Sequence, residues 1–194
     1  MMEGYEGVGG GDFTHNSQQA IIKARAIATQ NSQQRIDALH LLKALLSQPE
    51  SMVVLCLREM GIDLEKIQEK TARLIDQIPK VEAAEGMAGQ FYLTQDLAQV
   101  LAAAKKIAVQ MKDQFISTEH LFLALLETES QAREVLTNQP GLNQESFLAT
   151  LAKLRGDSQV DDPHPESKYQ VIKKYTRDLT KLAEEGKLDP VIGR

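Results

Sequence analysis

The sequence contains no tryptophan and one cysteine, and aromatic residues make up only 5% of its 194 positions. A sheet protein would be expected to use more aromatic and β-branched residues, so a chain dominated by alanine and aliphatic residues favours packed helices. Because Cys56 is the only cysteine, no disulfide can form within the chain. Its apolar neighbours on both sides predict a buried and unreactive thiol.

Basic residues are too few for a general nucleic-acid binder. The net charge is −5, whereas contact with phosphates requires clusters of Lys and Arg. No apolar run approaches the ~20 residues that span a membrane, and the first residues lack the basic start and apolar core of a signal peptide. We therefore expect a cytoplasmic chain that binds neither nucleic acid nor membrane.

Catalytic motifs are missing as well. The Walker A pattern G-x-x-x-x-G-K-[ST], which cradles a nucleotide phosphate, does not occur, and we assign no Walker B motif. No H-E-x-x-H motif or paired Cys/His spacing marks a metal site. We therefore assign no catalytic residue and no metal ligand, and we expect that this chain is not itself an enzyme.

What the sequence does contain is a duplication. Residues recur at a fixed offset of 80 positions (94 − 14), and no gap is needed to align the two copies. A repeat of this length that is rich in alanine and leucine predicts two equivalent helical units. The matching pairs are Thr14 with Thr94, Ala24 with Ala104, Ile27 with Ile107, Ala28 with Ala108, Ile36 with Ile116, His40 with His120, Leu41 with Leu121, 44–46 with 124–126, Gly61 with Gly141 and Leu74 with Leu154.

Capping residues and helix breakers predict four helices in each unit, and hence eight in two pseudo-symmetric repeats of an all-α domain. Thr14 and Asp37 are placed to cap the first two helices, and Gly61 to end the third. His40 and His120 lie early in equivalent helices, which favours packing or capping roles over metal binding. The first-unit helices are expected from Thr14 to a polar break at 31–34, from Asp37 through Leu46, over about 50–60, and from Asp63 to Pro79; those of the second unit are expected near 94–111, 117–127, 130–138 and 143–155.

Composition also divides the chain into segments. The first residues are rich in glycine, and two prolines and several acids mark a linker after the repeats. We expect a flexible leader (1–12), a repeat domain (13–155, with repeats at about 13–78 and 93–155), an exposed linker (156–167), and a final segment (168–194) with one more helix. That segment completes no stable unit, so we expect the chain to be a fragment of a longer protein.

Two features resemble one known family. The duplicated four-helix unit resembles the Clp N-terminal repeat domain, and YTRDLT (175–180) with GKLDPVIGR (186–194) resembles the entry into the first AAA+ ATPase module of Clp proteins. Four shorter strings are similar to ClpB-like disaggregases rather than to ClpA or ClpC, namely PKVE at 79–82, LRG at 154–156, PE at 165–166 and KY at 174–175. The resemblance covers residues 13–194 and implies a Clp N-terminal domain followed by the truncated start of an AAA+ module.

The resemblance implies a substrate-recognition function. Domains of this type engage unfolded or aggregated polypeptides and pass them to the ring of an ATP-dependent protein disaggregase. The parent is implied to be a homohexameric AAA+ ATPase that binds ATP and Mg and works with the Hsp70 system, whereas this chain alone is expected to be a monomer without a cofactor. By the same resemblance, Val191, Ile192 and Gly193 belong to the adenine side of a nucleotide site that this chain does not complete.

The resemblance also implies substrate-binding residues. Thr14, Asp113 and Glu119 fall on the polar positions that flank the apolar groove of ClpB-type domains. Such acceptors can hold the backbone N–H groups of an extended ligand without reading its side chains. The apolar groove candidates are Phe13, Leu93, Leu97, Leu101 and Phe115. Of these, Leu97 and Leu101 are spaced four apart and equally fit the core of a helical domain.

Structural roles remain open for the polar candidates. Thr14 can be a helix cap with no further role. The carboxylate of Glu119 can simply be stabilised by the positive end of the helix dipole. The repeat partners of Asp113 and Glu119 are Gln33 and Leu39. This difference favours a function, because a purely architectural role would more readily be kept in both copies.

Two other functions remain open. The domain could dock a folded adaptor protein, as similar domains of ClpA and ClpC do. It could also be a structural element that supports ring assembly without a ligand of its own. Binding of an unfolded protein in preference to a folded adaptor would separate substrate recognition from adaptor docking.

Overall fold

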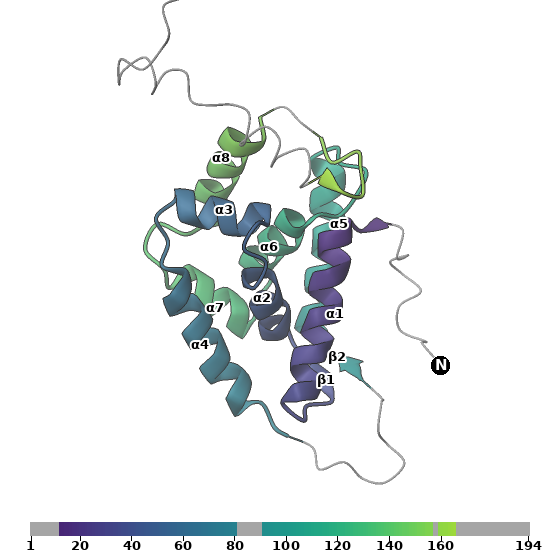
Figure 1. Ribbon diagram of the computed structural model, residues 1–194, viewed down its shortest axis with the longest axis vertical. Helices are drawn as coiled ribbons and strands as arrows, with labels where there is room; N and C mark the ends of the chain where they lie inside the picture. The colour runs from purple at the N-terminus through teal and green to yellow at the C-terminus, as the bar shows by residue number, and fades with distance from the viewer. Residues whose placement is uncertain (1–11, 81–90, 157–158, 166–194) are drawn as a thin grey trace, which may run out of the picture.

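A computed structural model of the chain describes residues 12–80, 91–156 and 159–165 (Figure 1). These residues form eight α-helices, which confirms the predicted all-α fold. The first repeat contributes α1 (His15–Gln30), α2 (Ala38–Leu46), α3 (Met52–Glu59) and α4 (Leu64–Gln77), and the second contributes α5 (Gln95–Gln110), α6 (Thr118–Glu127), α7 (Gln131–Thr137) and α8 (Gln144–Arg155).

Several predictions concern residues outside this description. Most of the leader, the additional helix expected within 168–194, and the adenine-side residues Val191, Ile192 and Gly193 all lie outside the described residues. Among the described residues, no helix combines the length and apolarity that a membrane crossing requires.

The predicted capping residues stand where the helices begin. The side chains of Thr14, Asp37 and Asp63 each accept a hydrogen bond from a backbone N–H in the first turn of α1, α2 and α4. Thr94 does the same for α5, 80 positions after Thr14. These bonds satisfy donors that a helix cannot pair within itself. The duplication therefore preserves the local signals that start each helix.

Two central helices hold the domain together. Nearly every residue of α2 and of α6 is buried, and the two helices contact each other. Helix α1 packs on α2, and α5 packs on α6 (Figure 1). A helix that is apolar on all sides is stable only when other helices surround it. The core is therefore a single one, shared by both repeats.

The repeats are interleaved rather than placed side by side. The third helix of each repeat packs against the fourth helix of the other, so that α3 contacts α8 and α7 contacts α4. The fixed offset in the sequence predicts equivalent units, but it does not show that helices of one repeat pack against helices of the other. Because each repeat buries apolar surface against the other, neither forms a complete bundle by itself.

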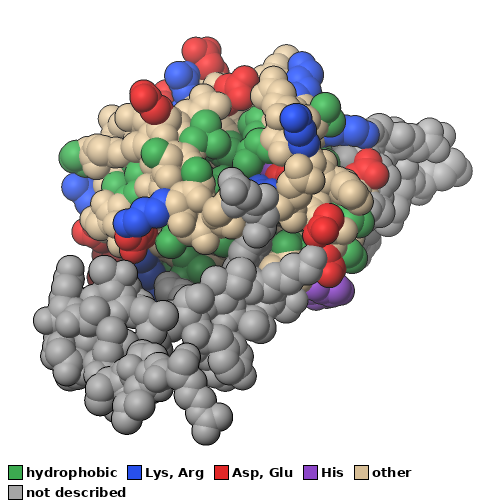
Figure 2. Space-filling model, turned by 90° about the horizontal axis from the view of Figure 1, so that it is seen from above, with side chains coloured by type: hydrophobic (Ala, Val, Ile, Leu, Met, Phe, Trp, Pro, Cys, Tyr) green, Lys and Arg blue, Asp and Glu red, His purple; other side chains and the backbone are tan. Residues whose placement is uncertain are grey.

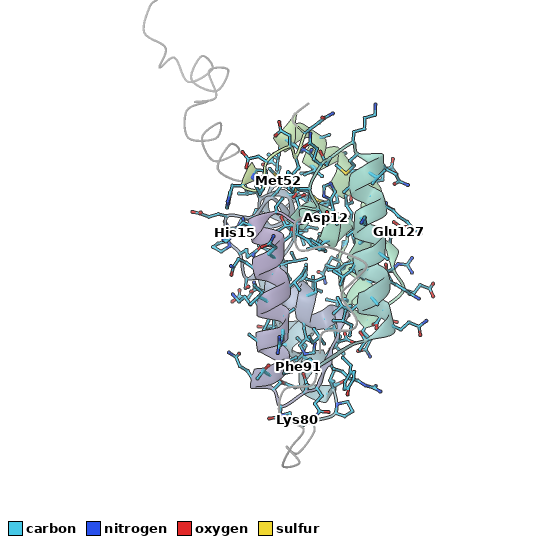
Figure 3. All side chains as sticks on the ribbon, turned by 90° about the vertical axis from the view of Figure 1, so that its right-hand side faces the viewer. Asp12, His15, Met52, Lys80, Phe91 and Glu127 are labelled. Carbon is cyan, nitrogen blue, oxygen red and sulfur yellow. The ribbon has the colours of Figure 1, made fainter. Side chains whose placement is uncertain are left out.

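Two short ladders, which the sequence did not predict, also join the repeats. Strand β1 (Arg35–Ile36) pairs in parallel with β2 (Tyr92–Leu93), just before α2 and α5 begin. The equivalent pairing on the other side is a parallel bridge between Phe13 and Ile116, just before α1 and α6. Figure 3 shows Asp12 and His15 toward one end of the molecule and Phe91 toward the other. Each ladder fixes the starting points of one helix from each repeat.

Gly61 follows the C-cap of α3, whereas Gly141 lies in the turn four residues after the end of α7, and both have positive φ values, of 69° and 81°. A Cβ at either position would meet no atom within 4 Å, so substitution costs only backbone strain. We expect Gly61→Ala and Gly141→Ala each to lower the free energy of unfolding by about 1 kcal/mol, and the double variant by about twice as much. Urea denaturation followed by circular dichroism measures both. Unchanged midpoints would contradict this account of the turns.

Candidate functional site

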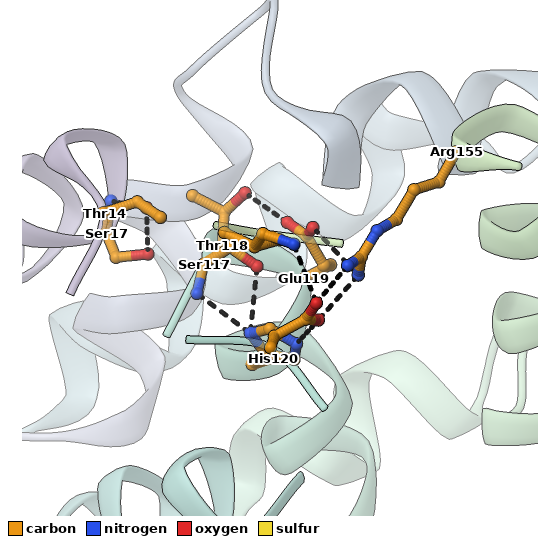
Figure 4. A network of polar contacts seen from close by, with 9 residues as sticks. Thr14, Ser17, Ser117, Thr118, Glu119, His120 and Arg155 are labelled. Atoms are coloured by element: carbon orange, nitrogen blue, oxygen red, sulfur yellow. Dashed lines mark hydrogen bonds and ion pairs between the residues drawn. The ribbon is translucent and has the colours of Figure 1, made fainter. Parts of the chain in front are cut away.

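The site predicted from the sequence lies where α1 and α6 begin. The backbone N–H of Thr14 donates to the Ile116 carbonyl at 3.0 Å, and the N–H of Ile116 donates to the Asp12 carbonyl at 2.7 Å. This ladder brings the first turn of α1 beside the segment that leads into α6. Figure 4 shows the polar side chains that gather there, with Arg155 reaching them from the C-terminal end of α8.

Thr14 is fully buried and acts as a helix cap. Its hydroxyl lies 3.0 Å from the hydroxyl of Ser17 and accepts a hydrogen bond from the Ser17 backbone N–H. The side chain therefore has a structural partner within α1. A ligand would reach it only if the surrounding segments moved, and its role as a ligand contact stays a prediction.

Asp113 lies at the centre of a buried charged network. Its carboxylate accepts hydrogen bonds from His120 Nε2 at 2.9 Å, from both terminal nitrogens of Arg155, and from the Val160 backbone N–H at 2.8 Å. Burial alone would raise the pKa of Asp113, but the bonds from His120, Arg155 and Val160 outweigh it and hold that pKa well below its usual range. Asp113 is therefore an anion around which other groups are arranged.

The first repeat contains a neutral version of the same network. Gln33, the repeat partner of Asp113, accepts from His40 Nε2 at 2.8 Å and donates to the carbonyls of Ile75 and Ile78. Ile75 is in turn the repeat partner of Arg155. Both copies thus tie the equivalent histidine to the end of the fourth helix. The change from Gln33 to Asp113 keeps this architecture and does not by itself point to a ligand.

His40 and His120 have the capping role that their equivalent positions predicted. In each copy the ring Nδ1 accepts the N–H of the residue before the helix, Asp37 for His40 and Ser117 for His120, at 2.9 Å. Nδ1 is then an acceptor and Nε2 carries the proton. Both rings are completely buried. Among the described residues, no group of three or more His, Cys, Asp or Glu side chains is arranged to hold a metal ion.

Glu119 differs from the other polar candidates. Its side chain is 1% exposed in the first turn of α6, and one carboxylate oxygen accepts from the Thr118 hydroxyl at 3.3 Å. The other oxygen, Oε1, has no hydrogen-bond donor within the described residues and lies 3.9 Å from Arg155 Nη1. Its repeat partner is the buried Leu39, so the fold does not require a carboxylate at this position.

Cys56 lies in the same region of the core. It is fully buried on α3, as the sequence predicts. Burial raises the pKa of the Cys56 thiol to about 12, and the Glu119 and Glu59 carboxylates add to the effect. A thiol with so high a pKa is not ionised near neutral pH and is therefore a poor nucleophile.

The apolar groove candidates fall into two groups. Phe13, Leu97 and Leu101 are buried members of the core, which agrees with the alternative reading of the two leucines. Leu93 and Phe115 are only half-buried, so both have surface that a ligand can reach. Figure 2 looks onto the molecule from above the view of Figure 1, and hydrophobic side chains there lie among acidic and basic ones. As ligand contacts, all five stay predictions.

Part of the linker expected at 156–167 is described by the structure, and most of its side chains are exposed, but its main chain is bonded to the domain. Residues 159–165, hereafter the strap, lie against the start of α1 and the loop before α6. Val160 is completely buried, and its carbonyl accepts the N–H groups of Gln114 at 3.0 Å and Phe115 at 3.3 Å. The Pro163 carbonyl accepts the N–H of His15 at 2.8 Å. Neither Val160 nor Arg155 was among the predicted site residues.

Two interleaved four-helix repeats that share one core, with polar side chains gathered where equivalent helices begin, define a Clp repeat (R) N-terminal domain. The model of that family matches residues 12–139, and the chain belongs to this family.

Among the curated relatives are ClpB chaperones. The chain is 38% identical over 185 residues to the chaperone protein ClpB of Nitratidesulfovibrio vulgaris, a match that covers 95% of this chain and 21% of the relative. The chain thus spans about a fifth of the length of the curated relatives it matches.

Solved structures share the fold. The Hsp104 N-terminal domain from Candida albicans aligns with a TM-score of 0.68 and 22% identity, over 80% of this chain and 99% of that one. A ClpV N-domain in complex with a VipB peptide aligns with a TM-score of 0.57 and 19% identity, over 73% of this chain and 88% of that one.

Proposed function

We propose that this domain recognises unfolded or aggregated polypeptides as the substrate-recognition module of a ClpB-type protein disaggregase. The relationship to ClpB chaperones along nearly the whole chain supports the proposal. Glu119 carries it in structural terms, because its buried Oε1 has no hydrogen-bond donor within the described residues. A buried acceptor without a hydrogen-bond donor costs stability even beside Arg155, and the equivalent position of the first repeat holds Leu39 instead of a carboxylate.

The side chain of Glu119 is 1% exposed, so a peptide would reach it only if the segments that cover it moved. Its chemistry then suits the backbone of an extended chain. A carboxylate oxygen accepts an N–H from any residue except proline, so it holds a peptide without selecting its sequence. The half-buried Phe115, in the loop before α6, would add non-directional apolar contact, whereas Leu93 lies in the other ladder and away from Glu119. Such a surface binds many different unfolded segments weakly, which suits the capture of misfolded proteins.

The test is the substitution Glu119→Leu, which places the residue of the first repeat in the second. We expect this variant to stay folded and to bind fluorescein-labelled casein, an unfolded protein, about tenfold to a hundredfold more weakly. The estimate assumes the loss of one charge-assisted hydrogen bond. Fluorescence anisotropy measures the affinity, and circular dichroism during urea denaturation checks the fold.

The matched control is Glu127→Gln, which neutralises an exposed carboxylate on the same helix. It should leave casein binding unchanged. Thr14→Ala and Asp113→Ala are also expected to weaken binding, but each removes a helix cap or a buried network as well. The assignment of Glu119 is excluded if folded Glu119→Leu binds casein as tightly as the unchanged protein.

Docking of a defined partner is the second candidate, because a ClpV N-domain of the same fold has been solved with a VipB peptide. A partner of that kind would bind a fixed surface and select a sequence. A pulldown that compares casein with a folded adaptor protein separates the two functions. Retention of the adaptor without casein would favour docking.

The rest of the protein follows from the same relationship. We infer that the parent is an AAA+ ATPase ring that binds ATP and Mg, receives polypeptides from this domain and works with the Hsp70 system. The residues expected on the adenine side, Val191, Ile192 and Gly193, lie outside the described residues. The domain described here would supply recognition and would take no part in the chemistry of ATP.

A further inference from the structure

The main chain of the strap is hydrogen-bonded to the domain at both Val160 and Pro163. The Val160 N–H donates to Asp113 Oδ1, the Val160 carbonyl accepts from the N–H of Gln114, and the Pro163 carbonyl accepts from the N–H of His15. The side chains of Asp161, Pro163 and His164 are exposed. Only Val160 and Pro165 are buried. The strap bends at Asp162 and Pro163, so the residue that a client backbone would imitate most directly is Val160.

The groups that hold the strap are those that recognise an extended peptide. One carboxylate oxygen accepts a backbone N–H, and three backbone N–H groups, of Gln114, Phe115 and His15, donate to the carbonyls of Val160 and Pro163. Extended peptides bind to proteins through such main-chain pairing, with pockets for alternate side chains. Val160 fills the one side-chain position that is completely enclosed. The surface is thus already shaped for a short extended segment with one apolar residue.

We propose that the strap is an internal stand-in for an extended client, and that the two compete for Asp113, Gln114 and His15. This inference rests on the proposed function, because it takes an unfolded polypeptide as the partner. A client segment would present an N–H to Asp113 Oδ1, a carbonyl to the Gln114 N–H and an apolar side chain in the place of Val160. The strap would then leave the domain as the client binds.

Competition, rather than fixed attachment, agrees with how the strap is held. When the strap leaves, the N–H groups of Gln114 and His15 lose their acceptors, and Asp113 loses one donor. Asp113 nevertheless keeps His120 and Arg155, so its anion remains in place. A client backbone supplies the lost partners again. Replacement of the strap by a client thus keeps the number of hydrogen bonds the same and leaves the core of the domain intact.

The first test loosens the strap. Val160→Ala removes buried apolar surface from the strap and leaves Asp113, Gln114 and His15 unchanged. We expect it to bind fluorescein-labelled casein up to about tenfold more tightly, because the loss of a few methyl contacts shifts the competing equilibrium by that factor. Val109→Ala is the matched control, since Val109 is 69% exposed on α5. It should leave the affinity unchanged.

The second test holds the strap in place. The rings of His15 and His164 lie 5.2 Å apart, so a short bis-maleimide can link cysteines introduced as His15→Cys and His164→Cys. The native Cys56 is buried and should not react. Casein binding should fall at least tenfold in the cross-linked protein. The comparison is made with the same double-cysteine protein before cross-linking, so that only the link differs.

The outcomes separate this inference from the proposed function. Tighter binding by Val160→Ala together with weaker binding after cross-linking supports competition. If the unchanged protein binds casein and neither change alters the affinity, the strap does not compete, although the proposed function stands. If neither the unchanged protein nor folded Val160→Ala binds casein, the proposed function fails and competition fails with it.

Discussion

Arg155→Met should lower the free energy of unfolding by about 3–5 kcal/mol at neutral pH. The guanidinium of Arg155 donates through both terminal nitrogens to Asp113 and lies 3.9 Å from Glu119 Oε1. All three side chains are at most 5% exposed, so the substitution leaves two carboxylates in a region that water does not reach. Urea denaturation followed by circular dichroism measures the loss.

Lys153→Met is the matched control on the same helix. Lys153 pairs with Glu59 at 2.8 Å, but the two side chains are 71% and 46% exposed. Surface ion pairs contribute little because water already solvates both charges. The control should therefore keep the urea midpoint of the unchanged protein. A midpoint for Arg155→Met that equals that of Lys153→Met would show that the buried carboxylates do not depend on Arg155.

A triple variant tests whether the two networks are equivalent. Asp113→Gln, Glu119→Leu and Arg155→Ile together place in the second repeat the residues of the first, Gln33, Leu39 and Ile75. Neutral or apolar replacement of a complete buried ion cluster often preserves stability, whereas removal of one member does not. The triple variant should therefore recover most of the stability that Arg155→Met loses. It should also bind casein more weakly, because Glu119 is gone.

Local signals in the sequence predicted most of the fold. Each helix needs a cap and an apolar stripe, and both are legible within a few neighbouring residues such as Thr14 or Asp37. The exchange of helices between repeats was not predictable, because an offset of 80 positions shows which helices are equivalent and not which copy each one contacts. The ladders were not predicted either, because two-residue strands leave no pattern in a sequence.

The site was predicted less completely. The resemblance led to Asp113 and Glu119 but not to Arg155. Arg155 contacts Asp113 directly, but 42 positions separate the two residues in the sequence, so no local pattern links them. One signal was available, namely that Arg155 is the repeat partner of Ile75 and so places a charge where the other copy is buried. The attachment of the strap was not predicted, because acids and prolines are typical of exposed linkers and give no sign of the main-chain bonds and the buried Val160 that hold it.

Acidification between about pH 6.5 and pH 4 should cost the domain about 3 kcal/mol of stability through His40 alone. Burial lowers the pKa of His40 from 6.5 to about 4. Protonation of Nδ1 would also lose the hydrogen bond that this nitrogen accepts from the Asp37 N–H. Within this range the unfolded chain binds a proton at His40 and the folded domain does not, so stability falls as the pH falls.

The variant that isolates this effect is His40→Gln, since glutamine can still accept the Asp37 N–H from its place in the capping box. We expect it to be less stable than the unchanged protein near neutral pH but to lose less stability on acidification. The raised pKa of Asp37, which is caused mainly by burial, acts in both proteins and cancels in the comparison. The lowered pKa of Asp113 acts at lower pH, below about 4, where its protonation in the unfolded chain begins.

Urea midpoints measured from about pH 7 down to pH 4.5 test this prediction. This range includes most of the stability loss expected from His40 and little of that expected from Asp113. His15→Gln serves as a control that removes an exposed histidine and keeps His40, and it should retain the acid loss. Parallel pH profiles for His40→Gln and the unchanged protein would mean that the buried ring accepts its proton without opening the helix start, which the hydrogen bond that Nδ1 accepts from Asp37 argues against.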